Sequence, residues 1–146
     1  HGYTTRAECD LTCFGVSAIS KVGDSYSQSV RTVNAYYERL DQGRLPIEKG
    51  FALSLDDVLR RDIIMTLMCS APVDFAALNA RYGIDFVSYF APELERLKPY
   101  QEAGLITLDD TSIRVTPKGR LFVRASGMVF DRYLGQPTTS TYSKLI

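Results

Sequence analysis

The sequence predicts a mainly α-helical protein with one small β-hairpin, and two local patterns carry this prediction. Residues Ser54–Asp57 form a helix-capping signature, and apolar residues follow them at helical spacing. The apolar runs 105–108 and 112–115 are separated by a short polar turn, which is typical of a hairpin. Helices followed by a hairpin and a last helix are the order of a winged helix, which we expect for residues 51–134.

The helices of this region have recognisable ends. Ser54 is the expected N-cap of the first helix, whose buried side should carry Leu55, Val58, Leu59, Ile63 and Leu67. Asp74 should cap a second helix that ends at Gly83, and Asp85 a third segment. Pro92 should restart that segment, because proline suits a first helical turn, and Pro99 should kink or shorten it.

The carboxy-terminal end should contain one more helix. Thr116-Pro117 reads as an N-cap followed by proline, and the helix that it opens should run to about Leu134. Residues 135–146 are rich in proline, threonine and serine, so we expect them to form a loose tail.

The amino-terminal part has a different pattern. Residues 11–19 are nearly all apolar or small, which predicts a strand buried on both faces, as in a parallel sheet. A single strand cannot form a sheet, so the strands that pair with it should lie outside this chain, unless the segment adopts another conformation here. The polar stretch 21–28 reads as a loop, and a helix should follow from Val30 to Leu40. We place the first domain at residues 1–45, with a connector at 43–50.

Composition excludes several classes of function. Seventeen basic and seventeen acidic residues cancel, so the chain has no long-range attraction for nucleic acid or anionic membranes. No apolar run approaches the ~20 residues that span a bilayer. Three cysteines, an odd number, argue against a disulfide-stapled secreted domain and favour the cytoplasm.

The side chains that carry chemistry in other proteins have simpler interpretations here. Cys9 and Cys13 have the spacing that begins a CxxxCxxC cluster motif, but the third position is Val16, so small core residues are the favoured interpretation. Cys69, which has apolar neighbours, should be core too. His1 is the only histidine, which makes Ser-His or Cys-His catalysis improbable. We therefore assign no catalytic and no metal-binding residue.

Two groups of charged residues each allow a functional and a structural interpretation. Arg60, Arg61 and the basic residues of the last helix (Lys118, Arg120 and Arg124) could bind substrate carboxylates. Ion pairing with the nearby Asp57 and Asp62, or plain solvation, is favoured. The segment 85–103 would be the recognition element of a DNA-binding winged helix. It holds four acids against two bases, which disfavours binding to phosphates.

The segment Gly15–Ser20 (GVSAIS) remains open between two interpretations. A glycine at a strand end permits close approach to a ligand, Ser17 and Ser20 offer hydroxyls, and Ile19 offers an apolar face to a flat ring. The alternative is a strand that simply turns a corner.

The chain resembles the carboxy-terminal portion of the oxygen-independent coproporphyrinogen III oxidase family (coproporphyrinogen dehydrogenases). The resemblance covers essentially the whole chain in many blocks in the same order. The blocks are GYTT at 2–5, Asp10-Leu11, GVSAIS at 15–20, Gly23-Asp24, Tyr36-Tyr37, RRD at 60–62, LMC at 67–69, DFA at 74–76, Tyr89-Phe90, TPKGR at 116–120, MVFDRYL at 128–134 and SKLI at 143–146.

The resemblance implies a radical S-adenosylmethionine enzyme of haem biosynthesis. In that family a 4Fe-4S cluster and S-adenosylmethionine generate a radical, and two propionates of coproporphyrinogen III become the vinyl groups of protoporphyrinogen IX. The cluster cysteines lie in an amino-terminal barrel-like domain, of which residues 1–45 would be the final strand and helix. By this resemblance Ile19 contributes to the cofactor pocket, and His1 stands where the family commonly has a neighbouring glutamine.

The sequence departs from the family pattern at a few positions: Cys13 replaces a glycine, Ser70 an asparagine, and Arg124-Ala125-Ser126 an Arg-Asn-Ile run. We expect the chain alone to be inactive and to hold no cofactor, with the missing amino-terminal domain as its partner and with self-association through the orphaned strand. The alternative is a stand-alone winged-helix module for protein interaction or nucleic-acid binding.

Overall fold

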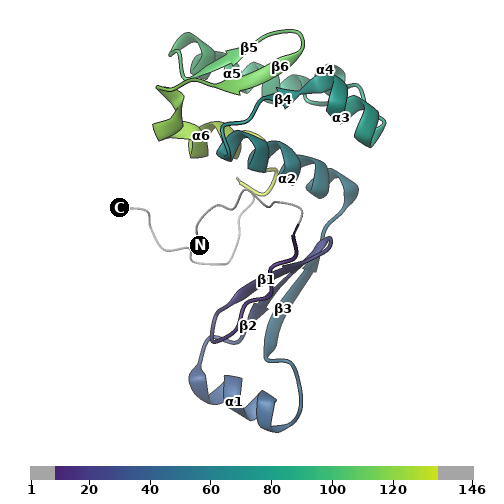
Figure 1. Cartoon of the computed structure of the whole chain (residues 1–146), viewed down its shortest axis with the longest axis vertical. Helices are drawn as coiled ribbons and strands as arrows, with labels where there is room; N and C mark the ends of the chain where they lie inside the picture. Colours follow the sequence, from purple (N-terminus) through teal and green to yellow (C-terminus); the bar gives the residue numbers. More distant parts are fainter. Residues whose placement is uncertain (1–8, 135–146) are drawn as a thin grey trace. The chain divides into compact units, whose positions relative to one another are not determined.

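The computed structural model describes residues 9–134, which divide into two compact units (Figure 1). The first unit comprises the described residues up to Arg61, and the second begins at Asp62. Among residues 9–134, no helix combines the length and the apolar character that crossing a bilayer requires. The expected loose tail, residues 135–146, lies outside the described part.

The first unit is built on a three-stranded antiparallel sheet. Its strands are β1 (Ile19–Val22), β2 (Ser25–Ser29) and β3 (Ile47–Ala52), in the order β1-β2-β3. A tight turn joins β1 to β2, and helix α1 (Val33–Asp41) lies in the connection from β2 to β3 (Figure 1). The expected helix before Gly43 is therefore present, although it begins three residues after Val30.

The predicted buried strand at residues 11–19 is wrong. This segment makes a single isolated bridge, from Leu11 to Lys21, and most of it is irregular and exposed. The stretch 21–28, predicted as a loop, instead contributes to β1 and β2, and the predicted connector 43–50 contributes to β3. These polar residues form strands because β2 pairs with β1 on one side and with β3 on the other. The backbone N–H and C=O groups of β2 are thereby hydrogen-bonded whatever its side chains are.

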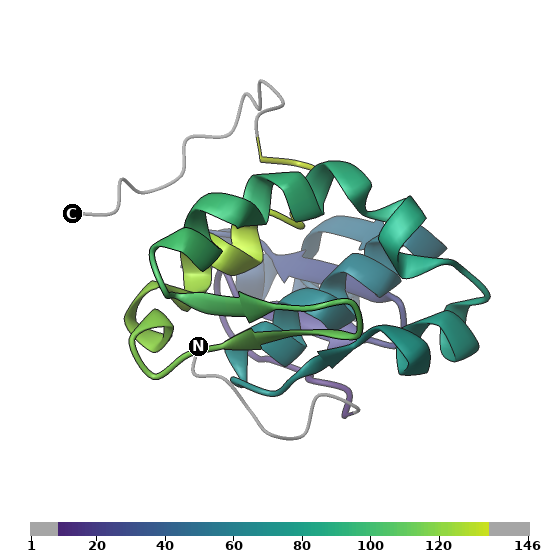
Figure 2. The same cartoon turned by 90° about the horizontal axis from the view of Figure 1, so that it is seen from above.

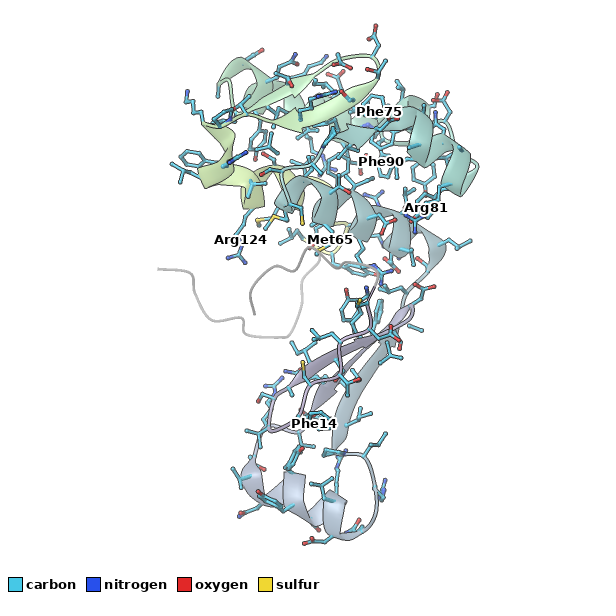
Figure 3. The ribbon with its side chains drawn as sticks, in the orientation of Figure 1. Phe14, Met65, Phe75, Arg81, Phe90 and Arg124 are labelled. Atoms are coloured by element: carbon cyan, nitrogen blue, oxygen red, sulfur yellow. The ribbon has the colours of Figure 1, made fainter. Side chains whose placement is uncertain are left out.

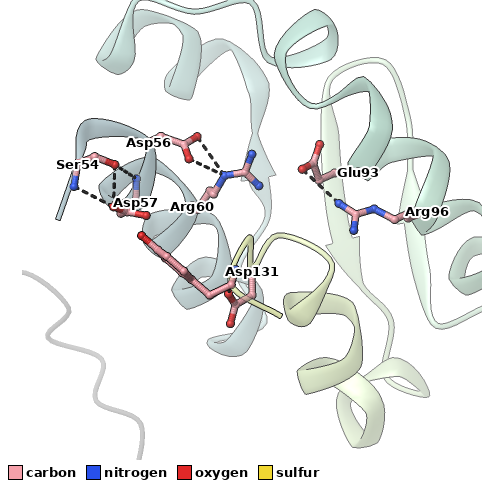
Figure 4. Close-up of polar contacts among 8 residues, drawn as sticks. Ser54, Asp56, Asp57, Arg60, Glu93, Arg96 and Asp131 are labelled. Atoms are coloured by element: carbon pink, nitrogen blue, oxygen red, sulfur yellow. Dashed lines mark hydrogen bonds and ion pairs between the residues drawn. The ribbon is translucent and has the colours of Figure 1, made fainter. Parts of the chain in front are cut away.

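Helix α2 (Leu55–Met68) begins as the capping signature predicts. The Ser54 hydroxyl accepts a hydrogen bond from the backbone N–H of Asp57 at 3.2 Å, and the Asp57 carboxylate accepts one from the Ser54 N–H at 2.9 Å (Figure 4). This reciprocal pair is a capping box. On the expected buried side, Leu59, Ile63 and Leu67 are buried, whereas Leu55 is exposed.

The next helices begin near the predicted residues, but Asp85, the expected cap of the third segment, makes no capping hydrogen bond to the backbone. In α3 (Phe75–Tyr82) the N-cap Asp74 accepts a hydrogen bond from the Ala77 N–H at 2.9 Å. The third segment is divided into α4 (Phe86–Tyr89) and α5 (Ala91–Glu102), and Pro92 lies in the first turn of α5. Pro99 lies inside α5, which continues for one further turn.

The predicted hairpin is part of a three-stranded sheet. Strands β5 (Ile106–Leu108) and β6 (Ser112–Val115) pair antiparallel, and a two-residue strand, β4 (Val73–Asp74), pairs with the other edge of β6. The strand order is β4-β6-β5. Figure 2 shows this hairpin running alongside α5. Two residues are too short a run for a sequence pattern to reveal β4.

The predicted continuous helix from residue 117 to Leu134 is wrong. The chain forms a 3₁₀ helix, η1 (Gly119–Phe122), and then a short α-helix, α6 (Val123–Met128). After α6 the N–H groups of Val129 and Phe130 bond to carbonyls three residues earlier, which closes turns and ends the helix. At its start, η1 approaches the Leu105 carbonyl closely through Gly119.

A chain of aromatic rings fills the core of the second unit. Phe75 stacks on Phe86 with ring centroids 4.2 Å apart, Phe86 meets Phe90 at 4.9 Å, and Phe90 meets Phe130 at 5.5 Å (Figure 3). Leu97, Ile106 and Ile113 are buried with them. By contrast, the buried apolar residues of the described first unit are Val30, Pro46 and Leu59.

Candidate functional site

The GVSAIS segment forms a tight, left-handed loop that leads into β1. Gly15 has φ +101° and Ser17 has φ +60°, and the Ala18 N–H reaches the Gly15 carbonyl at 3.4 Å. Ser17 is one of two non-glycine residues with positive φ in the described part of the chain. Such backbone conformations persist only where surrounding contacts hold them, and they cluster at ligand-binding sites.

Hydrogen bonds from three directions hold this loop. The Gly15 N–H donates to the hydroxyl of Tyr36 on α1 at 3.1 Å, and the Ser17 N–H donates to the Val30 carbonyl at 2.9 Å. The Ser29 N–H at the end of β2 donates to the Ala18 carbonyl at 2.8 Å. The loop is therefore positioned by β2 and α1, so its shape is preorganised.

Ile19, the predicted cofactor-facing residue, begins β1 opposite Gln28, and its side chain is 42% exposed. Phe14 and Val16 in the same loop also expose apolar side chains (Figure 3). The Ser20 hydroxyl accepts a hydrogen bond from the Cys13 N–H at 3.0 Å, so it is engaged inside the loop, whereas Ser17 is exposed. The arrangement offers an apolar surface for a flat ring. His1, the second predicted residue, lies outside the described residues.

The donor set does not fit an iron–sulfur cluster. Residues 9–134 contain no group of three or more histidine, cysteine, aspartate or glutamate side chains that could hold a metal ion. The predicted burial of the cysteines is also wrong, since Cys9 and Cys69 are exposed and Cys13 is half-buried. Cys69 is exposed because the chain has left α2 at this point and turns through Ser70, whose φ is +56°.

The arginines of α2 pair with carboxylates, as the simpler interpretation predicts, but Asp62, one of the two expected partners, pairs with Arg81. Arg60 Nε lies 3.0 Å from the Asp56 carboxylate (Figure 4). Arg61 Nη2 lies 3.2 Å from the carboxylate of Asp24 in the β1–β2 turn. Arg61 thus joins the first half of α2 to the hairpin of its own unit. Sequence spacing alone could not reveal the partner of Arg61, since the two residues are 37 positions apart.

A second cluster of polar residues was not predicted. The Asp62 carboxylate accepts a hydrogen bond from the Tyr82 hydroxyl and lies 3.0 Å from Arg81 Nη1. These contacts join the start of the second unit to α3. All three groups are occupied with one another, which makes this a structural cluster.

The turn between β5 and β6 shifts the pKa of a carboxyl group. The Thr111 hydroxyl and the Thr111 and Ser112 N–H groups donate to Asp109 Oδ1 at 2.6 to 2.8 Å. These hydrogen bonds, the one from the Thr111 hydroxyl above all, lower the pKa of the Asp109 carboxyl below its ordinary value. Asp109 is fully ionised near neutral pH, which suits a turn-forming role.

Comparison with known proteins identifies the second half of the chain. Residues 53–122 match the family described as the HemN C-terminal domain. The family match includes the capping box of α2, the aromatic residues of α3 and α4, and the β5–β6 hairpin.

Relatives that match nearly all of the chain carry one description. The oxygen-independent coproporphyrinogen III oxidase of Escherichia coli K12 is 42% identical over 135 residues, which cover 92% of this chain and 30% of the relative. The protein of the same description from Pseudomonas aeruginosa is 45% identical over 148 residues, covering 99% of this chain and 32% of the relative. The chain thus spans about a third of the length of these relatives.

A solved structure agrees with this match over most of the chain. It is described as "Coproporphyrinogen III oxidase (HemN) from Escherichia coli is a Radical SAM enzyme". It superimposes with a TM-score of 0.85 at 40% sequence identity and covers 90% of this chain and 30% of that structure. The architecture described above is therefore that of a HemN C-terminal region.

Proposed function

We propose that this chain is the carboxy-terminal part of an oxygen-independent coproporphyrinogen III oxidase. In the whole protein, two propionates of coproporphyrinogen III would be oxidatively decarboxylated to the vinyl groups of protoporphyrinogen IX in haem biosynthesis. The support is similarity along nearly the whole chain to relatives of that description. We infer that residues 1–45 complete the catalytic domain of that enzyme and that residues 51–134 form a separate winged-helix-like domain.

The observation that carries this proposal is the exposed apolar surface of the first unit. Its described residues expose twelve large hydrophobic side chains: Leu11, Phe14, Val16, Ile19, Val22, Val33, Tyr37, Leu40, Leu45, Ile47, Phe51 and Leu55. A self-contained domain of this size would bury most of these side chains. An apolar surface that stays exposed to this extent marks an interaction site. We infer that the amino-terminal portion of the enzyme covers this surface.

The edge strand β3 of the first sheet supports the same inference. Every residue of β3 is exposed, and β3 lies at the edge of the sheet with unpaired backbone groups along one side. Proteins normally cover or blunt such an edge, since it invites pairing with another strand. A larger sheet in the whole enzyme would cover this edge, and in the isolated chain the same edge favours self-association.

The chemistry of the reaction would come from the rest of the enzyme. A 4Fe-4S cluster with S-adenosylmethionine supplies the hydrogen-abstracting radical when both are bound, and the described residues of this chain do not provide the cluster's ligands. We infer that the chain alone is inactive. Its own contribution is the preorganised GVSAIS loop, where Ile19 would pack against the cofactor's apolar parts and exclude water from them.

The second unit would enclose the substrate from the open side of the catalytic domain. Its element order, α2-β4-α3-α4-α5-β5-β6 with strands ordered β4-β6-β5, supports a winged-helix-like fold. The same topology is the specific observation in favour of the alternative, a winged-helix interaction or nucleic-acid-binding module. The charges of α5 disfavour nucleic acid, since Glu93 pairs with Arg96 and Glu95 with Lys98, which leaves no net positive charge for phosphates. We expect the enzyme to work in the cytoplasm.

A chimeric enzyme tests the proposal. The amino-terminal two thirds of the Pseudomonas relative, joined to this chain, should form protoporphyrinogen IX from coproporphyrinogen III with S-adenosylmethionine. The same two thirds without this chain should be inactive. The Ile19→Asp variant should bind S-adenosylmethionine more weakly, because a charge would face the apolar part of the ligand, whereas Val22→Asp on the same strand serves as its control. A folded, cluster-loaded chimera that makes no product would contradict the proposal.

A further inference from the structure

Positive charge is concentrated in one segment of this electrically neutral chain. Residues 111–130 contain no aspartate or glutamate, and they carry four basic residues: Arg114, Lys118, Arg120 and Arg124. Three of these lie in or next to η1 and α6. A local excess of positive charge in a neutral protein attracts anions to that surface.

The apolar residues of the same segment are exposed to solvent. Leu121 is 87% exposed and Phe122 is 52% exposed, and both lie in η1 between Arg120 and Arg124. Arg124 follows two residues later in α6, and its side chain is exposed as well. Together Lys118, Arg120, Leu121, Phe122 and Arg124 form what we call the basic–apolar surface.

The two arginines of this surface are available to a ligand. Within residues 9–134, neither Arg120 nor Arg124 pairs with a carboxylate, whereas Arg60, Arg61, Arg81 and Arg96 all do. Figure 3 shows the Arg124 side chain extending away from α6. Lys118 is partly engaged, since its Nζ donates to the Ala103 carbonyl at 2.8 Å.

Free guanidinium groups beside exposed apolar side chains suit a ligand that is both apolar and anionic. Arginine binds carboxylates with two parallel hydrogen bonds, and an aromatic ring such as that of Phe122 packs on a flat macrocycle. We propose that the basic–apolar surface binds a tetrapyrrole, with Arg120 and Arg124 pairing with its carboxylate-bearing side chains. This inference rests on the proposed function, and it assigns to the second unit the residues that recognise the substrate's carboxylates.

Nucleic acid fits this surface less well. Three cations on a short segment would neutralise few phosphates, and Leu121 and Phe122 would lie against a charged backbone. An acidic surface of another part of the enzyme remains the competing partner, and the experiment below distinguishes it from the tetrapyrrole.

Titration of the chain with coproporphyrin III, the stable oxidised form of the substrate, tests the proposal. Fluorescence quenching should show saturable binding that weakens as salt is added, because charge pairing is screened. Arg120→Gln and Arg124→Gln should each weaken the binding by roughly tenfold, since each removes a charge-assisted pair. Leu121→Ser should weaken it less. Circular dichroism should show unchanged helix content, as all three residues are exposed.

Arg44→Gln is the matched control. Arg44 is also exposed and has no carboxylate partner among the described residues, but it lies in the first unit, outside the basic–apolar surface. Its variant should bind coproporphyrin III like the unchanged chain. Protoporphyrin IX, which carries two carboxylates in place of four, should bind more weakly to the unchanged chain. Equal binding by all variants, or equal loss in Arg44→Gln, would overturn the proposal.

The chimeric enzyme separates this inference from the proposed function. In an active chimera, Arg124→Gln should raise KM for coproporphyrinogen III and leave KM for S-adenosylmethionine unchanged. An active chimera whose KM values do not change would refute the tetrapyrrole site and leave the proposed function intact. Weaker association of the two protein parts, with unchanged porphyrin binding, would assign this surface to a protein contact instead.

Discussion

Gly119 lies directly against the carbonyl group of Leu105. A Cβ atom at position 119 would stand 1.8 Å from the Leu105 oxygen and 2.7 Å from its carbonyl carbon. The same carbonyl accepts a hydrogen bond from the Thr116 N–H at 3.0 Å, and the Thr116 hydroxyl accepts one from the Gly119 N–H at 3.0 Å. This contact joins the start of η1 to the start of the β5–β6 hairpin.

Gly119→Ala should therefore destabilise the protein by about 3 kcal/mol, because the backbone of two segments must separate to admit the methyl group. Chemical denaturation measures the change. Gly127→Ala is the matched control: its Cβ would lie 3.6 Å from the Ile64 side chain and 3.8 Å from Met68, which is ordinary contact. Since Gly127 lies in α6, alanine should stabilise it by up to about 1 kcal/mol. Equal effects of the two substitutions would contradict this account.

Two aspartates precede helices in the second unit, but the carboxylate of only one caps the backbone. Asp74→Ala should destabilise the protein by about 1 kcal/mol, since the Ala77 N–H loses its acceptor. Asp85→Ala should change stability by less than about 0.5 kcal/mol, because its carboxylate accepts from the Ser88 hydroxyl and from no backbone group of α4. Thermal unfolding of the two variants compares them, and a larger loss in Asp85→Ala would rule out the capping role of Asp74.

The Tyr82 hydroxyl and the Asp62 carboxylate form the contact between α3 and α2. Tyr82→Phe should destabilise the protein by about 1–2 kcal/mol, because the half-buried carboxylate loses a hydrogen-bond donor. Tyr100→Phe controls for loss of a hydroxyl, since no hydrogen bond of the Tyr100 hydroxyl is recorded in the described residues. In denaturant unfolding, equal midpoints for the two variants would show that the Tyr82 bond adds nothing.

The Asp109 turn should make the β5–β6 hairpin sensitive to acid. Because the folded state lowers the pKa of Asp109, the hydrogen-bonded carboxylate stabilises the fold above its unfolded-state pKa. That contribution is lost as the pH falls through the folded-state pKa. Carboxyl NMR titration should show the pKa of Asp109 rising in Thr111→Val, which removes the hydroxyl donor, and unchanged in Thr107→Val on β5. An unchanged pKa in Thr111→Val would assign the shift to the backbone donors alone.

Short-range signals made α2 and much of the second unit predictable. The capping box at Ser54 and Asp57, the N-cap Asp74 and the turn at Asp109 all satisfy backbone groups within four residues. Pro92 lies in the first turn of α5, where its missing N–H leaves no hydrogen bond unmade. Such patterns are visible in a sequence because every partner lies in the same short stretch. The resemblance to the family could also be seen in the sequence, because many short blocks of residues resemble those of the family and occur in the same order.

The remaining features depend on residues far apart in the sequence. The composition of residues 11–19 predicts a buried strand, yet the strands of the first unit are formed by residues 19–29 and 47–52. Which segments become strands depends on which backbones fold next to one another. At Gly119, where the 3₁₀ helix η1 begins, the Leu105 carbonyl, fourteen positions away, occupies the space that a side chain would fill. Arg61 forms an ion pair with Asp24, whereas Arg120 and Arg124 pair with no carboxylate in the described part of the chain. Local capping and turn chemistry could be predicted from the sequence, whereas strand partners, close backbone approaches and charge pairing required the tertiary structure, because only folding brings the partners together.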